Sequence, residues 1–383
     1  MKELSESRIL IVDDARTNVD VLVEALRADY KLSVALDGKT ALRSVEKSLP
    51  DLVLLDIMMP GLDGYEVCRQ LRAHESTREL PVMFLSSLED VNNKAQGFEV
   101  GANDYLTKPF EVLEVKARVR SLLKAKAYAD AVREAMARDL RIAREIQMGI
   151  LPADLAGATR GTGLEVHALI EPARAVGGDL YEVLRIADDR VVVALGDVSG
   201  KGIPAALFMA VTVTVLRTLA RQILEPDEIL ERLNRELAEQ NPSGMFVTMQ
   251  CLVFDVTQRR VSCAVAGHHS LAVLSAGHPP RLACESSGMP AGLMAHNPLE
   301  RELLPLVPGD TFVLFSDGVS EAMNTDEDFY GEERLLAALA TVSGATPAEI
   351  VARVMADVRA FTAGAKQSDD ITILAARYAP KMS

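Results

Sequence analysis

The chain has 383 residues, of which 49% are hydrophobic, and its formal net charge is -14. A chain of this length suits two or three domains, each with enough apolar residues for a core of its own. The acidic balance argues against nucleic acid or an anionic membrane surface as the main partner.

The rest of the composition argues against redox motifs, secretion and membrane insertion. The four cysteines form no Cys-x-x-Cys pair, so zinc and redox motifs are disfavoured. The polar start from Met1 to Ser7 lacks the apolar core of a signal peptide, and no apolar run approaches the ~20 residues of a membrane span. We therefore expect a soluble, cytoplasmic protein that binds neither membrane nor nucleic acid.

Four short apolar strands in the first 123 residues each end at polar side chains. Helix-compatible segments such as Thr17–Ala28 and Gly64–His74 lie between them. This alternation predicts a doubly wound parallel sheet, in which ligands bind at the carboxyl ends of the strands. The strands and their polar ends are Arg8–Val12 (Asp13, Asp14), Asp51–Asp56 (Asp56), Pro81–Ser86 (Ser86) and Asp104–Lys108 (Lys108).

These polar strand ends suit the transfer of a phosphoryl group. Asp56 ends a buried strand and can accept the group, while Asp13 and Asp14 can hold Mg²⁺ through oxygen. The ion would offset repulsion between the carboxylates and phosphate. Lys108 brings a cation to a phosphoryl oxygen, and Ser86 brings a hydroxyl donor. Any one of these residues alone would indicate a turn or a solvated surface group, but together they favour a site.

The segment resembles the response-regulator receiver domain over about the first 120 residues. The resemblance rests on Asp13-Asp14, the run from Leu55 to Gly64, Ser86 and Lys108-Pro109-Phe110. It implies a flavodoxin-like fold and phosphorylation of Asp56 by a sensor histidine kinase or a phosphotransfer protein. It also implies Mg²⁺ bound by Asp14, Asp56 and the Met58 carbonyl with help from Asp13, a cis Lys108-Pro109 bond, and a switch formed by Ser86, Tyr105 and Lys108.

From about residue 111 to 150 the pattern becomes that of one long helix. Apolar or small residues recur at spacings of three, four and seven, with charges between them. We interpret 124–150 as a linker helix between a receiver domain (1–123) and a second domain (151–380). It could carry a signal, join two copies of the chain as a homodimer, or be only a solvated spacer. Lys126, Arg133 and Gln147 interrupt the seam, which consists of Val115, Val119, Leu122, Ala129, Met136, Leu140, Ala143 and Ile150.

The region from about 153 to 380 has the pattern of an α+β or layered β/α domain. Its expected strands are Val191–Leu195, Met249–Phe254, Thr311–Phe315 and Ile371–Leu374, and its expected helices are Ala205–Arg221 and Pro226–Glu239.

Aspartates in this region stand beside glycine or at strand ends in four separate places. Carboxylates without neighbouring His or Cys favour Mg²⁺ or Mn²⁺, and two such ions could share Asp197 and activate water for attack on phosphorus. The loop from Gly196 to Gly202 lacks the residue spacing of a P-loop. The four places are Val176–Asp179, Gly196-Asp197, Phe315–Gly318 and Ser368–Asp370.

These motifs resemble the PPM (type 2C) metal-dependent protein phosphatases, in the bacterial branch that acts on anti-sigma-factor antagonists. The resemblance covers 140–380 and rests on Ala143–Gln147 with Leu151-Pro152, Glu171–Asp179, Gly196–Gly202, Ala276–Pro280, Ser316–Ala322 and Ser368–Thr372. It implies a layered α-β-β-α fold and a phosphoserine or phosphothreonine protein as substrate. It implies two Mn²⁺ or Mg²⁺ ions, with ligands and catalytic carboxylates drawn from Asp179, Asp197, the Val198 carbonyl, Asp317 and Asp369, and with Asp370 adjacent.

Some residues near these motifs leave alternatives open. Leu180 stands where many relatives have an aromatic residue. His268, His269 and His278 could suggest a metal site, but we interpret them as polar groups of loops or strands. Lys201 and Arg174 are candidates for contacting substrate phosphate, with ordinary surface charge as the alternative.

The two constellations together predict a two-component response regulator in which phosphorylation of Asp56 controls a phosphatase acting on an anti-sigma-factor antagonist. Two other interpretations stay open. One is an adaptor that binds a sigma factor or antagonist without turnover, and the other is a constitutive phosphatase that its receiver does not control.

Overall fold

The computed structural model describes residues 4–87, 99–239, 241–285 and 288–380, so the first three residues of the polar Met1–Ser7 segment lie outside the described part. The chain divides into two compact units, Met1–Arg138 and Asp139–Ser383. The division falls inside a helix, and the domain boundaries expected at 123 and 150 stay predictions.

The first unit contains a five-stranded parallel sheet in the order β2-β1-β3-β4-β5. All five residues of β3 are buried because the sheet is covered on both faces. The predicted doubly wound sheet is thereby confirmed. The strand β2 escaped prediction because most of its residues are not buried, so it lacks a continuous apolar run. The strands are β1 (Arg8–Val12), β2 (Lys31–Ala35), β3 (Leu52–Asp56), β4 (Val82–Ser87) and β5 (Asp104–Lys108).

Helices on the two faces of this sheet bury separate apolar clusters. One cluster includes Leu10, Val53 and Phe84, and the other includes Ile9 and Leu22, because successive strand residues point to opposite faces. The carboxylates of Asp37 and Asp63 cap α2 and α3 by accepting hydrogen bonds from backbone N–H groups. The helices described before β5 are η1 (Leu4–Glu6), α1 (Arg16–Leu26), α2 (Gly38–Lys47) and α3 (Gly64–Ala73).

The long helix α5 (Val112–Ile150) confirms that one helix follows the receiver, but the expected seam does not form a single free stripe. Val115 and Val119 are fully buried in the receiver core, together with Leu123. These side chains cannot contact a second copy of the chain, so the prediction of a dimer-forming seam is wrong for the first part of the helix. A continuous heptad pattern does not distinguish packing on the same chain from packing on a partner.

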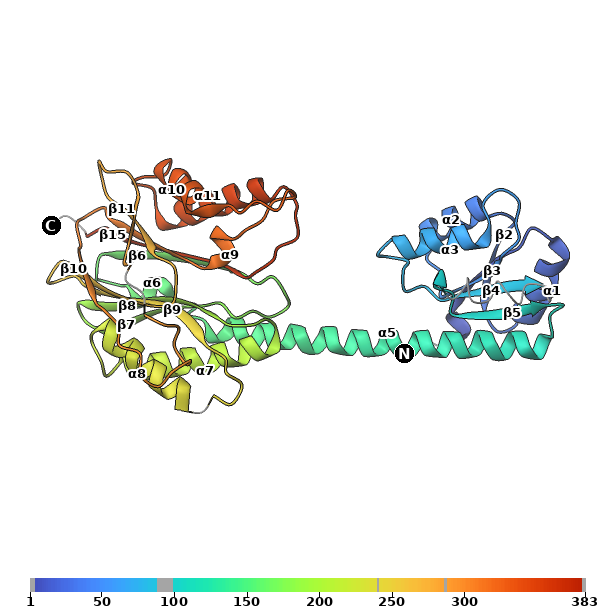
Figure 1. Ribbon diagram of the computed structural model, residues 1–383, viewed down its shortest axis with the longest axis horizontal. Coiled ribbons are helices and arrows are strands. Elements are labelled where there is room, and N and C mark those ends of the chain that lie inside the picture. Colours follow the sequence, from blue (N-terminus) through green and yellow to red (C-terminus); the bar gives the residue numbers. More distant parts are fainter. Residues whose placement is uncertain (1–3, 88–98, 240, 286–287, 381–383) are drawn as a thin grey trace. The chain divides into compact units, whose positions relative to one another are not determined.

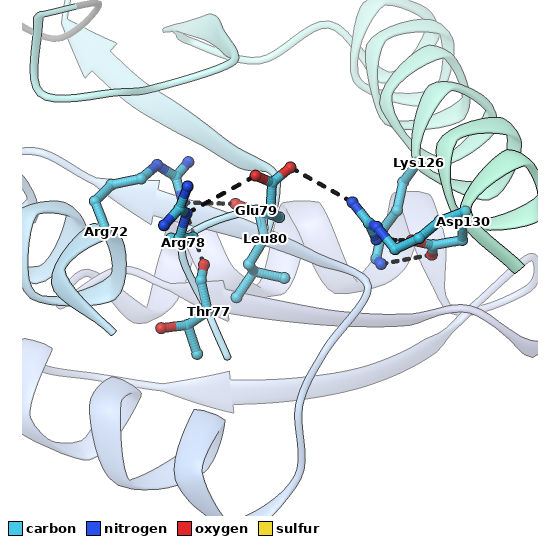
Figure 2. Close-up of polar contacts among 8 residues, drawn as sticks. Arg72, Thr77, Arg78, Glu79, Leu80, Lys126 and Asp130 are labelled. Atoms are coloured by element: carbon cyan, nitrogen blue, oxygen red, sulfur yellow. Dashed lines mark hydrogen bonds and ion pairs between the residues drawn. The ribbon is translucent and has the colours of Figure 1, made fainter. Parts of the chain in front are cut away.

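The charges that interrupt the seam have partners within the receiver unit. Lys126 Nζ lies 2.7 Å from Asp130, and Arg133 contacts both Asp130 at 3.1 Å and Glu79 at 3.6 Å. Figure 2 shows this chain of charges running from α5 to the loop before β4, where Arg72 donates to the Leu80 carbonyl at 2.9 Å. These ion pairs are partly or fully exposed and contribute little individually, so the buried valines provide most of the attachment.

The second unit contains two antiparallel five-stranded sheets that pack face to face. Phe254 of one sheet and Phe312 of the other meet between them, with ring centroids 5.3 Å apart. The first sheet has the order β13-β10-β9-β8-β7, and the second β12-β11-β14-β15-β6. The strands are β6 (Leu164–Glu171), β7 (Leu180–Ala187), β8 (Arg190–Val198), β9 (Val247–Asp255), β10 (Arg260–Ala266), β11 (Leu271–Leu274), β12 (Arg281–Ala283), β13 (Glu302–Pro305), β14 (Thr311–Phe315) and β15 (Ile371–Tyr378).

Helices cover the outer face of each sheet. Helices α7 and α8 lie on one sheet and α10 and α11 on the other (Figure 1), which gives the expected α-β-β-α layers. Thr346 and Glu349 form a capping box at the start of α11. The helices are α6 (Leu155–Ala158), α7 (Ile203–Ala220), α8 (Pro226–Glu239), α9 (Asp317–Ser320), α10 (Gly331–Ala340) and α11 (Pro347–Thr362).

Helix α7 corrects the expectation that no apolar run approaches the length of a membrane span. Its 18 residues have a mean hydropathy of 1.8, and among the described residues this helix alone is long and apolar enough to cross a membrane. It packs against β7, β8 and α8. Its Arg217 forms an ion pair with buried Glu182 at 2.5 Å. A core helix of a folded domain passes the same test of length and composition.

Candidate phosphoryl-transfer sites

The parallel sheet of the first unit brings its polar strand ends together at one edge. Lys108 Nζ, at the end of β5, lies 2.8 Å from Asp13 Oδ2 and 2.9 Å from Asp56 Oδ1. Burial disfavours the charged form of Lys108, but the hydrogen bonds that it donates to Asp13 and Asp56 raise its pKa overall. The three residues therefore form one electrostatic unit, in which the lysine neutralises part of the carboxylate charge.

Three carboxylates at this edge are close enough to share one cation. Ligand oxygens of Asp13, Asp14 and Asp56 lie within 4.8 Å of one another, and only Asp14 is exposed. Burial and the neighbouring Asp13 charge raise the pKa of Asp56. A hard divalent cation would offset this repulsion, so the donor set fits Mg²⁺. Met58, whose carbonyl is a further expected ligand, is 70% exposed.

Of the other two expected switch residues, Ser86 lies near the carboxyl end of β4 and Tyr105 is the second residue of β5. Ser86 Oγ is buried and has no hydrogen-bond partner among the described residues, so it is free to donate to a phosphoryl oxygen. The Tyr105 side chain is buried against Phe84, with ring centroids 5.9 Å apart. The bond between Lys108 and Pro109 is cis.

In the second unit, the sandwich brings the distant aspartates into electrostatic contact. Asp179 precedes β7, Asp197 ends β8, Asp317 follows β14, and Asp369 precedes β15. Asp179 Oδ2 accepts a hydrogen bond from Thr372 Oγ1 at 2.5 Å. The other oxygens, Asp179 Oδ1 and Asp317 Oδ1, are buried without a partner among the described residues. Buried carboxylate oxygens with no donor fit direct binding of a cation.

Burial and mutual repulsion both raise the pKa values of these carboxylates. Burial, followed by the charges of Asp317 and Asp369, raises the pKa of Asp197 to about 7. Burial and Asp197 raise the pKa of Asp179, and burial and Asp369 raise that of Asp317. Within the described residues, no three of these oxygens are as closely grouped as those of the receiver. The aspartates of the second unit are therefore more widely spaced than the three carboxylates of the receiver.

The loop before Asp179 is fixed from both sides. Asp370 accepts hydrogen bonds from Ala173 N at 2.8 Å and from Gly178 N at 2.6 Å. Both of its carboxylate oxygens are therefore hydrogen-bonded to the backbone of the loop. Gly178 packs so closely on the next strand that a Cβ atom would lie 2.7 Å from the Val198 carbonyl oxygen. That approach brings the Val198 carbonyl, a further expected ligand, beside the loop that leads to Asp179.

The two candidate phosphate-binding cations differ in their surroundings. Lys201 Nζ lies 2.8 Å from Asp369 Oδ2 and donates to the Ser368 carbonyl at 2.7 Å, so it faces the acidic site. Arg174 is exposed, and its Nη1 atom would lie 4.0 Å from a Cβ atom added at Gly202. Lys201 is thus paired to one carboxylate of the site, whereas Arg174 lies near Gly202 in the loop after β8.

Sequence reasoning missed the supporting roles of three polar residues. Gln147, interpreted only as a break in the seam, is 5% exposed and forms two hydrogen bonds with the Gly177 backbone. His268 is also buried, whereas His278 of the expected Ala276–Pro280 motif is exposed. Thr372 binds Asp179 from β15. In the sequence, the available signal for such a residue is a polar side chain among apolar neighbours. That signal does not identify the hydrogen-bond partner, which depends on tertiary contacts.

The raised pKa of Asp197 predicts a pH-dependent stability of the metal-free protein. Because this pKa is about 7 in the folded state and about 4 when unfolded, stability should fall as pH rises through that window. Asp197→Asn should make the decline smaller, because only the raised pKa values of Asp179 and Asp317 then remain, and it should raise the free energy of unfolding at pH 8 by about 1–3 kcal/mol. Urea denaturation with a chelator, at pH 5 and pH 8, measures this. Asp188→Asn, on a fully exposed side chain, is the control, and an equal decline in wild type and Asp197→Asn would contradict the prediction.

Two known families match successive parts of this chain. Residues 9–120 match the response regulator receiver domain family. Residues 187–379, half of the chain, match the family described as Stage II sporulation protein E (SpoIIE). The chain belongs to the SpoIIE family. It therefore joins a receiver domain to a PP2C-type phosphatase domain, as the sequence motifs predicted.

Individual relatives match parts or most of this chain. The response regulator PleD of Caulobacter vibrioides is 44% identical over 165 residues, which are 43% of this chain and 34% of PleD. Protein IcfG of Synechocystis is 24% identical over 396 residues, covering 96% of this chain and 58% of IcfG. The chain thus spans less than two thirds of either relative.

Solved structures show the fold of the SpoIIE-family part. The SiaA-PP2C domain of Pseudomonas aeruginosa has a TM-score of 0.58 and 24% identity, covering 65% of this chain and 99% of that domain. The RsbU and RsbW domains of Rv1364c from Mycobacterium tuberculosis give a TM-score of 0.50 and 24% identity, covering 58% of this chain and 62% of that structure. At this identity the likeness concerns the layered fold.

Proposed function

We propose that this protein is a two-component response regulator in which phosphorylation of Asp56 controls a metal-dependent phosphoserine or phosphothreonine protein phosphatase. The observation that carries the proposal is the convergence of Asp179, Asp197 and Asp317 from separate strands into one acidic site. The match to the receiver and SpoIIE families supports the same order of input and output.

In the receiver, Asp56 is proposed as the phosphoryl acceptor from a sensor histidine kinase or phosphotransfer protein. Its carboxylate lies 2.9 Å from Lys108 Nζ, which would hold a phosphoryl oxygen once the group is transferred. Asp13, Asp14, Asp56 and the Met58 carbonyl would hold Mg²⁺. The Ser86 hydroxyl, which has no partner among the described residues, and the buried Tyr105 ring are proposed to respond to phosphorylation of Asp56.

In the phosphatase domain, Asp179, Asp197, Asp317, Asp369 and the Val198 carbonyl would hold two divalent cations, Mg²⁺ or Mn²⁺. Such cations supply Lewis-acid activation of water and neutralise charge on phosphate. Asp370 instead fastens the loop before Asp179, since both its oxygens accept backbone hydrogen bonds. Lys201 and Arg174 are proposed to bind the substrate phosphate from the rim.

We infer that the substrate is the phosphorylated form of a small anti-sigma-factor antagonist. The support is the likeness of the layered fold to structures that contain RsbU and SpoIIE phosphatase domains. A phosphatase assay with Mn²⁺ and a phosphoserine protein tests turnover directly. Stable capture of a phosphoprotein by the metal-loaded protein, without release of phosphate, would instead support an adaptor.

The linker helix is proposed to join two copies of the chain. Apolar side chains on α5 that remain exposed are Tyr128, Val132, Met136, Ile142 and Ile146. Spacings of four residues place several of them on one side of the helix, and pairing would bury them. Sedimentation equilibrium tests this, and a monomer at all protein concentrations would contradict it.

Control by the receiver gives a specific prediction. Treatment of wild type with a small acyl phosphate should raise Mn²⁺-dependent turnover, by about 5- to 150-fold if the coupling is typical of allosteric proteins. Asp56→Asn should show no response to the donor, because it lacks the acceptor oxygen, while its basal turnover persists. Phosphate release from a phosphoserine protein measures both. Equal rates with and without donor in wild type would support a constitutive phosphatase.

A further inference from the structure

His268 is a buried histidine whose two ring nitrogens both form hydrogen bonds. It is 9% exposed and follows β10 in the segment Ala266-Gly267-His268. Its Nδ1 atom lies 2.7 Å from Thr248 Oγ1 on β9, and its Nε2 atom lies 3.0 Å from the Phe315 carbonyl oxygen at the end of β14. The ring therefore connects a strand of one sheet to a strand of the other.

The partners determine which nitrogen carries the proton. A carbonyl oxygen can only accept, so Nε2 must donate to Phe315. Burial lowers the pKa of His268 to about 4, and the neutral ring then has an unprotonated Nδ1. Nδ1 accepts from the Thr248 hydroxyl, which consequently serves as donor. Each partner has a defined role, and the ring orientation is fixed at both ends.

The two anchoring points stand next to the proposed metal-binding carboxylates. Thr248 is the β9 partner of Asp197 in the sheet register. Phe315 is the last residue of β14 and is followed by Ser316 and Asp317. Asp197 therefore lies in one sheet, and Asp317 follows a strand of the other. The two carboxylates repel each other, and the charge of Asp317 raises the pKa of Asp197. A cation shared between them needs a fixed separation of the two sheets at this point.

We propose that His268 is a positioning residue that sets the separation of Asp197 and Asp317 through Thr248 and Phe315. This inference rests on the proposed metal-dependent phosphatase activity. Loss of either hydrogen bond would let the two repelling carboxylates move apart when no cation is bound. The result would be weaker cation binding and a slower chemical step, with little change in the surface that meets substrate.

Three substitutions separate this role from simple packing. His268→Phe keeps most of the ring volume but removes both hydrogen bonds. His268→Gln restores a donor near the Nε2 position, and Thr248→Val removes only the hydroxyl donor. The exposed His278, in a second Gly-His pair, provides the matched control His278→Phe.

Titration calorimetry with Mn²⁺ gives a readout that does not depend on turnover. We expect His268→Phe to raise the Mn²⁺ Kd about tenfold or more, Thr248→Val to raise it by a smaller factor, and His268→Gln to recover most of the affinity. With p-nitrophenyl phosphate as substrate, kcat should fall in the same order while KM changes little. Circular dichroism establishes whether each variant is folded. If His268→Phe does not fold, the Mn²⁺ Kd of Thr248→Val, compared with that of wild type, tests the proposal.

Two outcomes would overturn the proposal. One is a Mn²⁺ Kd that stays at the wild-type value in every folded variant, and the other is an equal loss in His268→Gln and His268→Phe, which would indicate a packing role. Failure of the proposed phosphatase activity has a different signature, because wild type itself would then release no phosphate and would bind no Mn²⁺ beyond the ion expected at the receiver carboxylates.

Discussion

The Asp317→Asn variant is expected to lose about a thousandfold of its Mn²⁺-dependent turnover of a phosphoserine protein. Asp317 Oδ1 is buried without a hydrogen-bond partner among the described residues, and its carboxylate lies close enough to Asp369 for the two charges to interact. The amide of asparagine keeps the shape of the side chain but not its charge. A cation would therefore bind less tightly and stabilise the transition state less well.

The measurement is phosphate release at saturating Mn²⁺, together with titration calorimetry of Mn²⁺ binding. Asp326→Asn, on an exposed residue of the loop that follows α9, is the matched control and should behave as wild type. Turnover within tenfold of wild type in Asp317→Asn, with normal Mn²⁺ binding, would remove Asp317 from the proposed site.

The second large effect is expected for Gly318→Ala. A Cβ atom at Gly318 would lie 1.9 Å from the Asp370 carbonyl oxygen and 2.8 Å from the Asp370 carbonyl carbon. Both atoms are backbone at the start of β15, so neither can move without displacing Asp369 and Asp370. We expect a loss of about 3 kcal/mol or more in the free energy of unfolding and weakened Mn²⁺ binding in whatever protein remains folded.

Urea denaturation monitored by circular dichroism measures the stability change. Gly149→Ala is the matched control, because its added Cβ atom would meet nothing within 4 Å. That glycine lies within α5, where alanine is the better helix former, so this variant should be as stable as wild type or more so by about 0.5–1 kcal/mol. Equal stability of Gly318→Ala and wild type would mean that β15 tolerates displacement at Asp370.

Helix α5 has buried or hydrogen-bonded residues near both of its ends. At its start, Val115 and Val119 are buried in the receiver core. Near its end, Gln147 holds the Gly177 backbone, and the Ile150 carbonyl accepts a hydrogen bond from Arg217 Nη2 at 2.6 Å. The loop that precedes Asp179 therefore contacts the same helix that begins in the receiver, which supports control of the proposed phosphatase by Asp56.

Four of the five receiver strands, and the chemistry of their ends, could be predicted from the sequence alone. Buried parallel strands appear as continuous apolar runs, so Asp56 and Lys108 could be placed at strand ends from local pattern alone. Asp179 and Asp197 were recognisable in the same way because glycine or a strand stands next to each. Strand ends and glycines beside aspartates are features of neighbouring residues, so they can be recognised from a short stretch of sequence.

The identity of the residues that support the site depends on contacts in the tertiary structure. The contact of Gln147 with Gly177, and of His268 with Thr248 and Phe315, joins segments that no short-range pattern relates. The same holds for Val115 on α5, whose heptad spacing fits a receiver core as well as a partner helix. Hydrophobic periodicity specifies that a face is buried, but the partner that buries it is chosen by packing across the whole fold.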